Sequence, residues 1–113
     1  MSDSFEELKK EITQFRDERN WKQFHTPKDL AICISLEAAE LLEVFQWSGK
    51  DVFVENKRAK IEEERADVMM YCLLMADITG LDMEEILRKK LEVNRKKYPV
   101  DKSYGKSDKY TEL

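Results

Sequence analysis

The sequence has few of the residues that interrupt regular structure. It contains only three glycines and two prolines in 113 residues, too few for the frequent turns of a sandwich or barrel of short strands. Gly49, Gly80 and Gly105 stand far apart, and none belongs to a GxxxxGK or GxGxxG phosphate-binding loop. An all-β protein and a parallel sheet with such a loop are therefore disfavoured, and the composition favours helices.

Cysteine and histidine are also scarce, with two cysteines and one histidine. Cys33 and Cys72 lie in apolar helical stretches without Cys-x-x-Cys spacing, which favours buried free thiols over a disulfide or a zinc site. The single histidine, His25, is not part of a Glu-x-x-His motif. A di-iron carboxylate bundle needs that motif and is disfavoured as well.

An excess of positive charge and a long uninterrupted apolar run are also absent from the sequence. Residues 1–83 carry 11 basic and 18 acidic side chains, residues 84–113 carry 9 and 6, and the net charge is −4. An acidic body with a basic end is a poor nucleic-acid binder, although a small anion remains possible. The N-terminus does not resemble a signal sequence, and Asp67 and Asp77 interrupt the longest apolar stretch, residues 66–81. The sequence thus predicts one soluble, cytoplasmic domain with no membrane segment.

Start and stop signals divide the chain into four helices. Ser4 with Glu7 resembles a capping box, Thr26 precedes a proline at a first helical position, and Gly80 is a favourable C-cap. The predicted helices cover residues 5–20, 26–47, 57–79 and 82–98. Their short connections favour an antiparallel bundle over residues 1–99. Residues 100–113 form a polar tail without periodicity, either disordered or ordered by a partner.

Each of the two middle helices carries acids within an apolar stripe. Glu37 and Glu40 lie one turn apart on the second helix, as do Glu64 and Asp67 on the third. Four carboxylates pressed between helices repel one another and lose hydration. An all-oxygen cluster suits Mg²⁺ or Mn²⁺. Protonation, lysine partners and ordinary solvated acids are the alternatives.

Aromatic and basic side chains flank these acids. Trp21 and His25 precede the second helix, and Trp47 lies at its end. Such rings are either part of the core or able to stack on a nucleobase. Lys90 and Asn94, four residues apart on the fourth helix, either meet phosphate and sugar oxygens or simply face solvent.

The acidic motifs have a family resemblance. EAAELLE at residues 37–43 and EERADV at 63–68 resemble the paired ExxE and ExxD motif of the MazG-like all-α nucleoside triphosphate pyrophosphohydrolases. Further segments resemble the dCTP pyrophosphatase branch of this family: residues 20–25, 45–47, 90–99 and 109–113.

The resemblance implies a four-helix MazG-like bundle and a magnesium-dependent enzyme. Such enzymes cleave a nucleoside triphosphate between the α- and β-phosphates, giving a monophosphate and pyrophosphate, often in nucleotide-pool sanitation. By the same resemblance, the metal ligands and catalytic residues are Glu37, Glu40, Glu64 and Asp67. The positions that enclose the base are Trp21, His25 and Trp47, and those that reach the sugar and phosphates are Tyr71, Lys90 and Asn94.

Substrate and assembly also follow only from the resemblance. dCTP or a modified cytosine nucleotide is the first expectation, with dUTP or phosphoribosyl-ATP as alternatives. A non-catalytic helical interaction protein is the alternative from another class. Glu40 is the candidate to orient or deprotonate the attacking water. The resemblance further implies a homotetramer, a dimer of dimers, in which the tail at 100–113 helps to close a neighbour's site.

Overall fold

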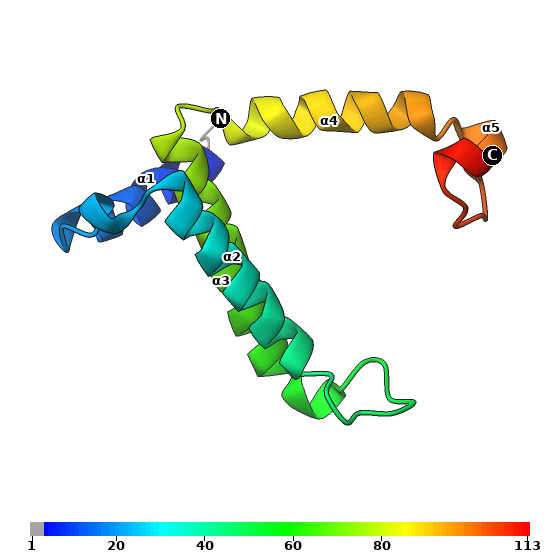
Figure 1. Cartoon of the computed structure of the whole chain (residues 1–113), viewed down its shortest axis with the longest axis horizontal. Coiled ribbons are helices and arrows are strands. Elements are labelled where there is room, and N and C mark those ends of the chain that lie inside the picture. The colour runs from blue at the N-terminus through cyan, green and yellow to red at the C-terminus, as the bar shows by residue number, and fades with distance from the viewer. Residues whose placement is uncertain (1–3) are drawn as a thin grey trace. The chain divides into compact units, whose positions relative to one another are not determined.

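The computed structural model describes residues 4–113, whose regular structure is entirely helical (Figure 1). The α-helices are α1 (Ser4–Glu18), α2 (Pro27–Glu43), α3 (Arg58–Ile78), α4 (Met83–Lys97) and the short α5 (Val100–Ser103). The 3₁₀ turns are η1 (Lys22–Phe24), η2 (Glu55–Lys57) and η3 (Tyr110–Glu112). The predicted all-α class with four long helices is confirmed.

The predicted helix signals act as expected. The Thr26 hydroxyl accepts the Asp29 N–H at 3.1 Å and caps α2, and the Asp82 carboxylate accepts the Glu85 N–H at 3.1 Å and caps α4. Gly80 follows the end of α3 with φ +68°, a left-handed conformation that costs glycine little. These signals fix where α2 and α4 begin and where α3 ends.

Two helices end earlier than predicted. The second was expected to reach residue 47, but α2 ends at Glu43. The next N–H groups, at residues 45–46, bond to carbonyls three residues back at 3.0 Å, and Trp47 takes φ +67°, so the chain leaves the helix. α1 likewise ends at Glu18 because Asn20 adopts φ +54°.

The chain divides into two compact units after Gly80. In the first unit, α2 and α3 lie side by side and α1 packs on α3 (Figure 1). Its buried apolar side chains are Leu30, Val44, Val54, Leu73, Leu74 and Ala76. An ion pair between a buried arginine and a partly exposed aspartate joins α1 to α3, because Arg16 Nη1 lies 2.7 Å from Asp77 Oδ2.

The second unit holds α4 and the tail at residues 100–113. The tail has more structure than its lack of periodicity indicates, because it forms α5 and η3. Tyr110 packs edge-on against Tyr98 at 5.9 Å between ring centroids, and the Lys97 ammonium lies 4.7 Å from the Tyr110 ring centre. These contacts attach the end of the tail to the end of α4.

Cys33 and Cys72 are free, as expected, but they are half-buried and not fully buried. Every helix within residues 4–113 is too short or too polar to cross a membrane.

Candidate functional site

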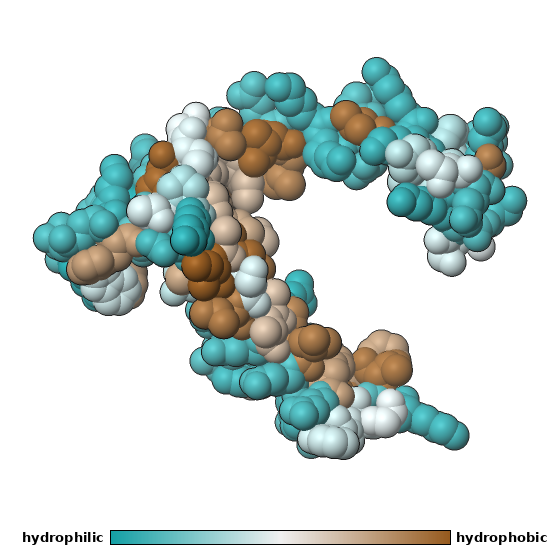
Figure 2. All heavy atoms as spheres, viewed as in Figure 1, coloured by the Kyte–Doolittle hydropathy of each residue, from teal (hydrophilic) through white to brown (hydrophobic). Residues whose placement is uncertain are grey.

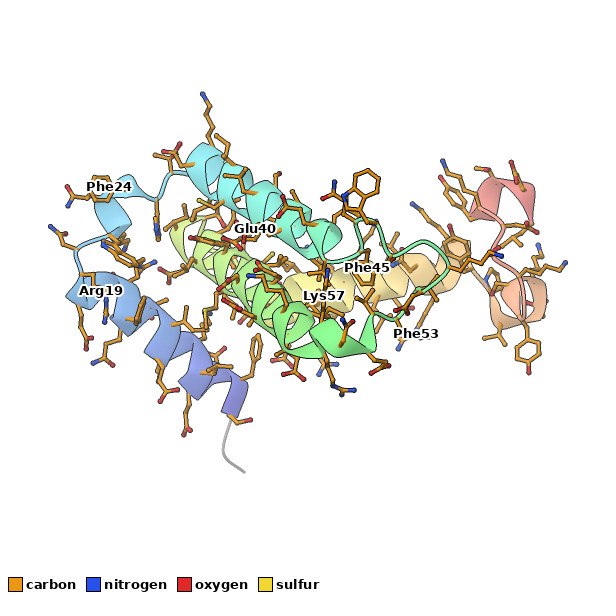
Figure 3. All side chains as sticks on the ribbon, turned by 90° about the horizontal axis from the view of Figure 1, so that it is seen from below. Arg19, Phe24, Glu40, Phe45, Phe53 and Lys57 are labelled. Carbon is orange, nitrogen blue, oxygen red and sulfur yellow. The ribbon has the colours of Figure 1, made fainter. Side chains whose placement is uncertain are left out.

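Three of the four predicted acids converge between α2 and α3. Glu37 and Glu40 of α2 and Glu64 of α3 each place one carboxylate oxygen within 4.8 Å of the other two. Figure 3 shows the Glu40 side chain in the space between the two helices. Glu64 is the most deeply buried of the three, with 1% of its surface exposed. We call Glu37, Glu40 and Glu64 the acidic cluster.

The acidic cluster is not satisfied by the protein alone. Within residues 4–113, Glu37 Oε2 and Glu64 Oε2 are buried without a hydrogen-bond partner. Burial and, to a lesser extent, the neighbouring Glu40 and Glu64 together raise the pKa of Glu37 to about 7. The adjacent Glu64 carboxylate raises the pKa of Glu40. Such a group of acids lacks positive charge.

Lys60 supplies part of that charge. Its ammonium lies 2.8 Å from Glu64 Oε1, one turn back along α3, and holds the pKa of Glu64 below its usual value. Within the acidic cluster, the lysine forms an ion pair with one oxygen of Glu64 and leaves Glu64 Oε2 and Glu37 Oε2 unpaired. Several carboxylate oxygens directed at one point form the donor set that Mg²⁺ and Mn²⁺ prefer. The residues present therefore fit a hard divalent cation.

Asp67, the fourth predicted acid, lies outside the acidic cluster. It lines a neighbouring cavity of about 270 Å³ between α1, η1 and α3. Three residues predicted to contact a nucleotide, Trp21, His25 and Tyr71, line the same cavity. Because Asp67 follows Glu64 by three residues on α3, one helical turn separates the cavity wall from the acidic cluster.

The cavity wall combines aromatic rings with polar groups, of which His25 and Tyr71 are uncharged. Trp21 packs against the edge of Phe15, with ring centroids 5.7 Å apart. Burial, with a smaller contribution from Arg16, lowers the pKa of His25, so its imidazole is neutral at pH 7. Burial also raises the pKa of Tyr71, which keeps its hydroxyl protonated. A partly aromatic recess whose wall includes the acidic Asp67 suits a planar base better than a phosphate group.

Comparison with known proteins places these residues in a family. Residues 32–113 match the model of the MazG-like family. The chain belongs to the MazG-like family. The family predicted from the acidic motifs is thus confirmed.

Two groups of relatives resemble this MazG-like chain over most of its length. It is 34% identical to dCTP pyrophosphatase 1 of Mus musculus and 33% identical to that of Homo sapiens, over 97% of this chain and 68% of each relative. The crystal structure of a pyrophosphatase from Archaeoglobus fulgidus is 43% identical and superimposes with a TM-score of 0.81. That match covers 88% of this chain and 95% of the archaeal chain.

Three of the residues of the MazG-like chain that were predicted to contact the nucleotide do not line the cavity. Trp47 is 92% exposed, in the turn after α2. Lys90 and Asn94 are exposed and lie one turn apart on α4, in the second unit. Their roles stay predictions.

Sequence reasoning missed two charged residues beside the site. Arg16 is not among the site residues predicted from the sequence, but it is buried and lines the cavity. Its spacing of four residues from Ile12, on the apolar face of α1, is the signal that could have found it. The same spacing between Lys60 and Glu64 indicates their ion pair.

Proposed function

We propose that this protein is a magnesium-dependent nucleoside triphosphate pyrophosphohydrolase that converts dCTP, or a modified cytosine nucleotide, to the monophosphate and pyrophosphate. The enzyme class follows from the chain's relatives, which are pyrophosphatases. Within the structure, the acidic cluster carries the proposal, because two helices direct three carboxylates at one point and leave two buried oxygens unpaired. Such an arrangement serves no purpose in a helical scaffold and costs it stability.

The acidic cluster and Asp67 would hold the metal. When bound, Mg²⁺ or Mn²⁺ would bind triphosphate oxygens, neutralise the charge that develops on the leaving pyrophosphate and assist attack by water. Glu40 is exposed at the edge of the acidic cluster, where it can orient the attacking water or accept its proton. No covalent link between enzyme and substrate is needed.

The cavity would hold the base. Ligand pockets usually measure about 300–1,000 Å³, and at about 270 Å³ this cavity suits a single base with the rest of the nucleotide outside it. Trp21 offers a stacking ring, and His25 and Tyr71 offer polar groups. The triphosphate would then extend past Asp67 towards the acidic cluster. We further propose that Trp47 helps to enclose the base.

We also propose a homotetramer, a dimer of dimers, whose tails at 100–113 help to close neighbouring sites, in a protein that acts in the cytoplasm on the nucleotide pool. Large apolar side chains exposed along α2 and α3 support association (Figure 2): Leu36 is 60% exposed, Leu42 72% and Met69 51%. Sedimentation equilibrium is the test, and a monomer at micromolar concentration would overturn this part of the proposal.

Triphosphate hydrolysis tests the function. Purified protein is incubated with Mg²⁺ and dCTP, dUTP, dATP or phosphoribosyl-ATP, and the products are separated by ion-exchange chromatography. We expect dCMP and pyrophosphate from dCTP, and no reaction with EDTA. Release of inorganic phosphate and dCDP would contradict cleavage between the α- and β-phosphates. No turnover of any substrate would leave a non-catalytic interaction protein.

Glu43 provides a matched control for the acidic cluster. It lies on α2 one turn after Glu40 and is exposed outside the cluster. We expect Glu37→Gln to abolish turnover and Glu43→Gln to leave it near the wild-type rate. Equal activity of the two variants would overturn the assignment of the metal site.

A further inference from the structure

Arg16 is an unusual residue for a cavity wall, because it is charged and only 2% of its surface is exposed. Its Nε donates to Asp17 Oδ1 at 2.8 Å and its Nη1 to Asp77 Oδ2 at 2.7 Å. A guanidinium carries five N–H donors and no acceptor. The two hydrogen bonds therefore leave three donors for a ligand or water in the cavity.

The local charge decides which ligand group suits these donors. Asp17 and Asp77 together carry more negative charge than Arg16 carries positive charge, and both contact the guanidinium directly. The surroundings of Arg16 thus have no excess positive charge with which to attract a triphosphate. Its three remaining N–H groups can still donate to an acceptor in the cavity, and a hydrogen bond from a charged donor is stronger than one from a neutral donor. A neutral carbonyl oxygen meets both conditions.

The two carboxylates also fix the direction of the guanidinium. Asp17 neighbours Arg16 on α1, while Asp77 lies on α3, so the ion pairs hold the side chain from two helices. The Arg16 carbonyl accepts the Trp21 N–H at 3.1 Å, which ties the aromatic wall to the same residue. The donors and the stacking ring therefore have a fixed relation to each other.

We propose that Arg16 determines base specificity by donating a hydrogen bond to the 2-carbonyl oxygen of a pyrimidine base. This inference rests on the proposed function. Cytosine and uracil both carry this oxygen, and adenine carries no carbonyl. A site built to hydrogen-bond a substrate group discriminates strongly against a substrate that lacks it. Arg16 thus favours pyrimidines over adenine and does not distinguish cytosine from uracil.

The test compares three substrates in two variants. Arg16→Met replaces the guanidinium donors by an apolar side chain of similar length. This variant should have a kcat/KM roughly 10- to 100-fold lower for both dCTP and dUTP, mainly because KM rises. The rate with dATP should change little. Asp77→Asn breaks the same ion pair between α1 and α3 but keeps the guanidinium, so it should keep the preference for dCTP over dATP. Equal losses for all three substrates in both variants would overturn the proposal and leave Arg16 a structural role only.

Wild-type protein keeps the test decisive if Arg16→Met fails to fold. Calorimetry without metal should show dCMP and dUMP binding more tightly than dAMP, and Arg16→Lys, which keeps the charge but loses the planar donors, should reduce this difference. A wild-type enzyme that hydrolyses dATP as well as dCTP would overturn the role of Arg16 and leave the proposed function intact. If the wild-type protein hydrolysed none of the triphosphates, the proposed function would be overturned. The calorimetric comparison of dCMP, dUMP and dAMP would then still test the role of Arg16.

Discussion

Replacing Glu37 by glutamine should stabilise the metal-free protein at alkaline pH. In the folded protein the pKa of Glu37 rises from 4.5 to about 7, chiefly because of burial. One pKa unit corresponds to about 1.36 kcal/mol, so ionisation of a fully shielded Glu37 would lower the free energy of unfolding of the protein by roughly 3 kcal/mol. Glu37 is partly exposed, so solvent screening reduces this to about 1–2 kcal/mol.

The sign of the effect follows from proton binding. Between pH 4.5 and about 7 the folded protein keeps a proton on Glu37 that the unfolded chain has released. Glu37 therefore lowers stability as pH rises through this window. The raised pKa of Glu40 acts in the same direction. The lowered pKa of His25 acts in the opposite direction near pH 6.5, so the difference between variant and wild type carries the prediction.

Thermal unfolding in EDTA from pH 5 to pH 8 measures this difference. The advantage in Tm of Glu37→Gln over wild type should grow by roughly 4–8 °C across the range. Glu43→Gln, on the same helix but outside the acidic cluster, should follow the wild-type profile. At pH 8, Mg²⁺ should stabilise the wild type and have little effect on Glu37→Gln. A constant difference between Glu37→Gln and wild type at all pH values would refute the reasoning.

Three further predictions concern single residues. Asp67→Asn should reduce turnover by roughly 100-fold or more while leaving the circular dichroism spectrum unchanged; an active variant would remove Asp67 from the site. Trp21→Ala should raise KM for dCTP about tenfold through lost stacking. Phe24 is 64% exposed and does not line the cavity, so Phe24→Ala should leave KM unchanged. Similar KM values for the two variants would show that the base binds elsewhere. Thr26→Ala should lower the free energy of unfolding by about 1 kcal/mol in urea titrations, because α2 loses its N-cap; restoration by Thr26→Ser would tie the loss to the hydroxyl.

The helix signals and the acids could be predicted because both are local. Thr26 and Asp82 cap helices within three residues, and the helical spacing of Glu37 and Glu40 places both on one face. The meeting of these acids with Glu64 required only that two long helices pack together.

The remainder depends on contacts between distant segments. The hydrogen bond from Arg16 to Asp77 spans 61 residues, so no spacing rule places the arginine on the cavity wall. Glu64 and Asp67 are three residues apart, like Glu37 and Glu40. Asp67 nevertheless lines the cavity, while Glu64 belongs to the acidic cluster. The early end of α2 depends on the positive φ of Trp47, which helical periodicity does not encode.

The two tryptophans also differ in a way that fluorescence can exploit. Trp47 projects into water, while Trp21 lines the cavity and is 45% exposed. Trp47 should therefore emit at the long wavelengths of an indole in water, and Trp21 at shorter ones. A Trp47→Phe variant would leave Trp21 as the single tryptophan, beside the proposed base pocket. Quenching of its fluorescence would then report nucleotide binding in real time without an added label.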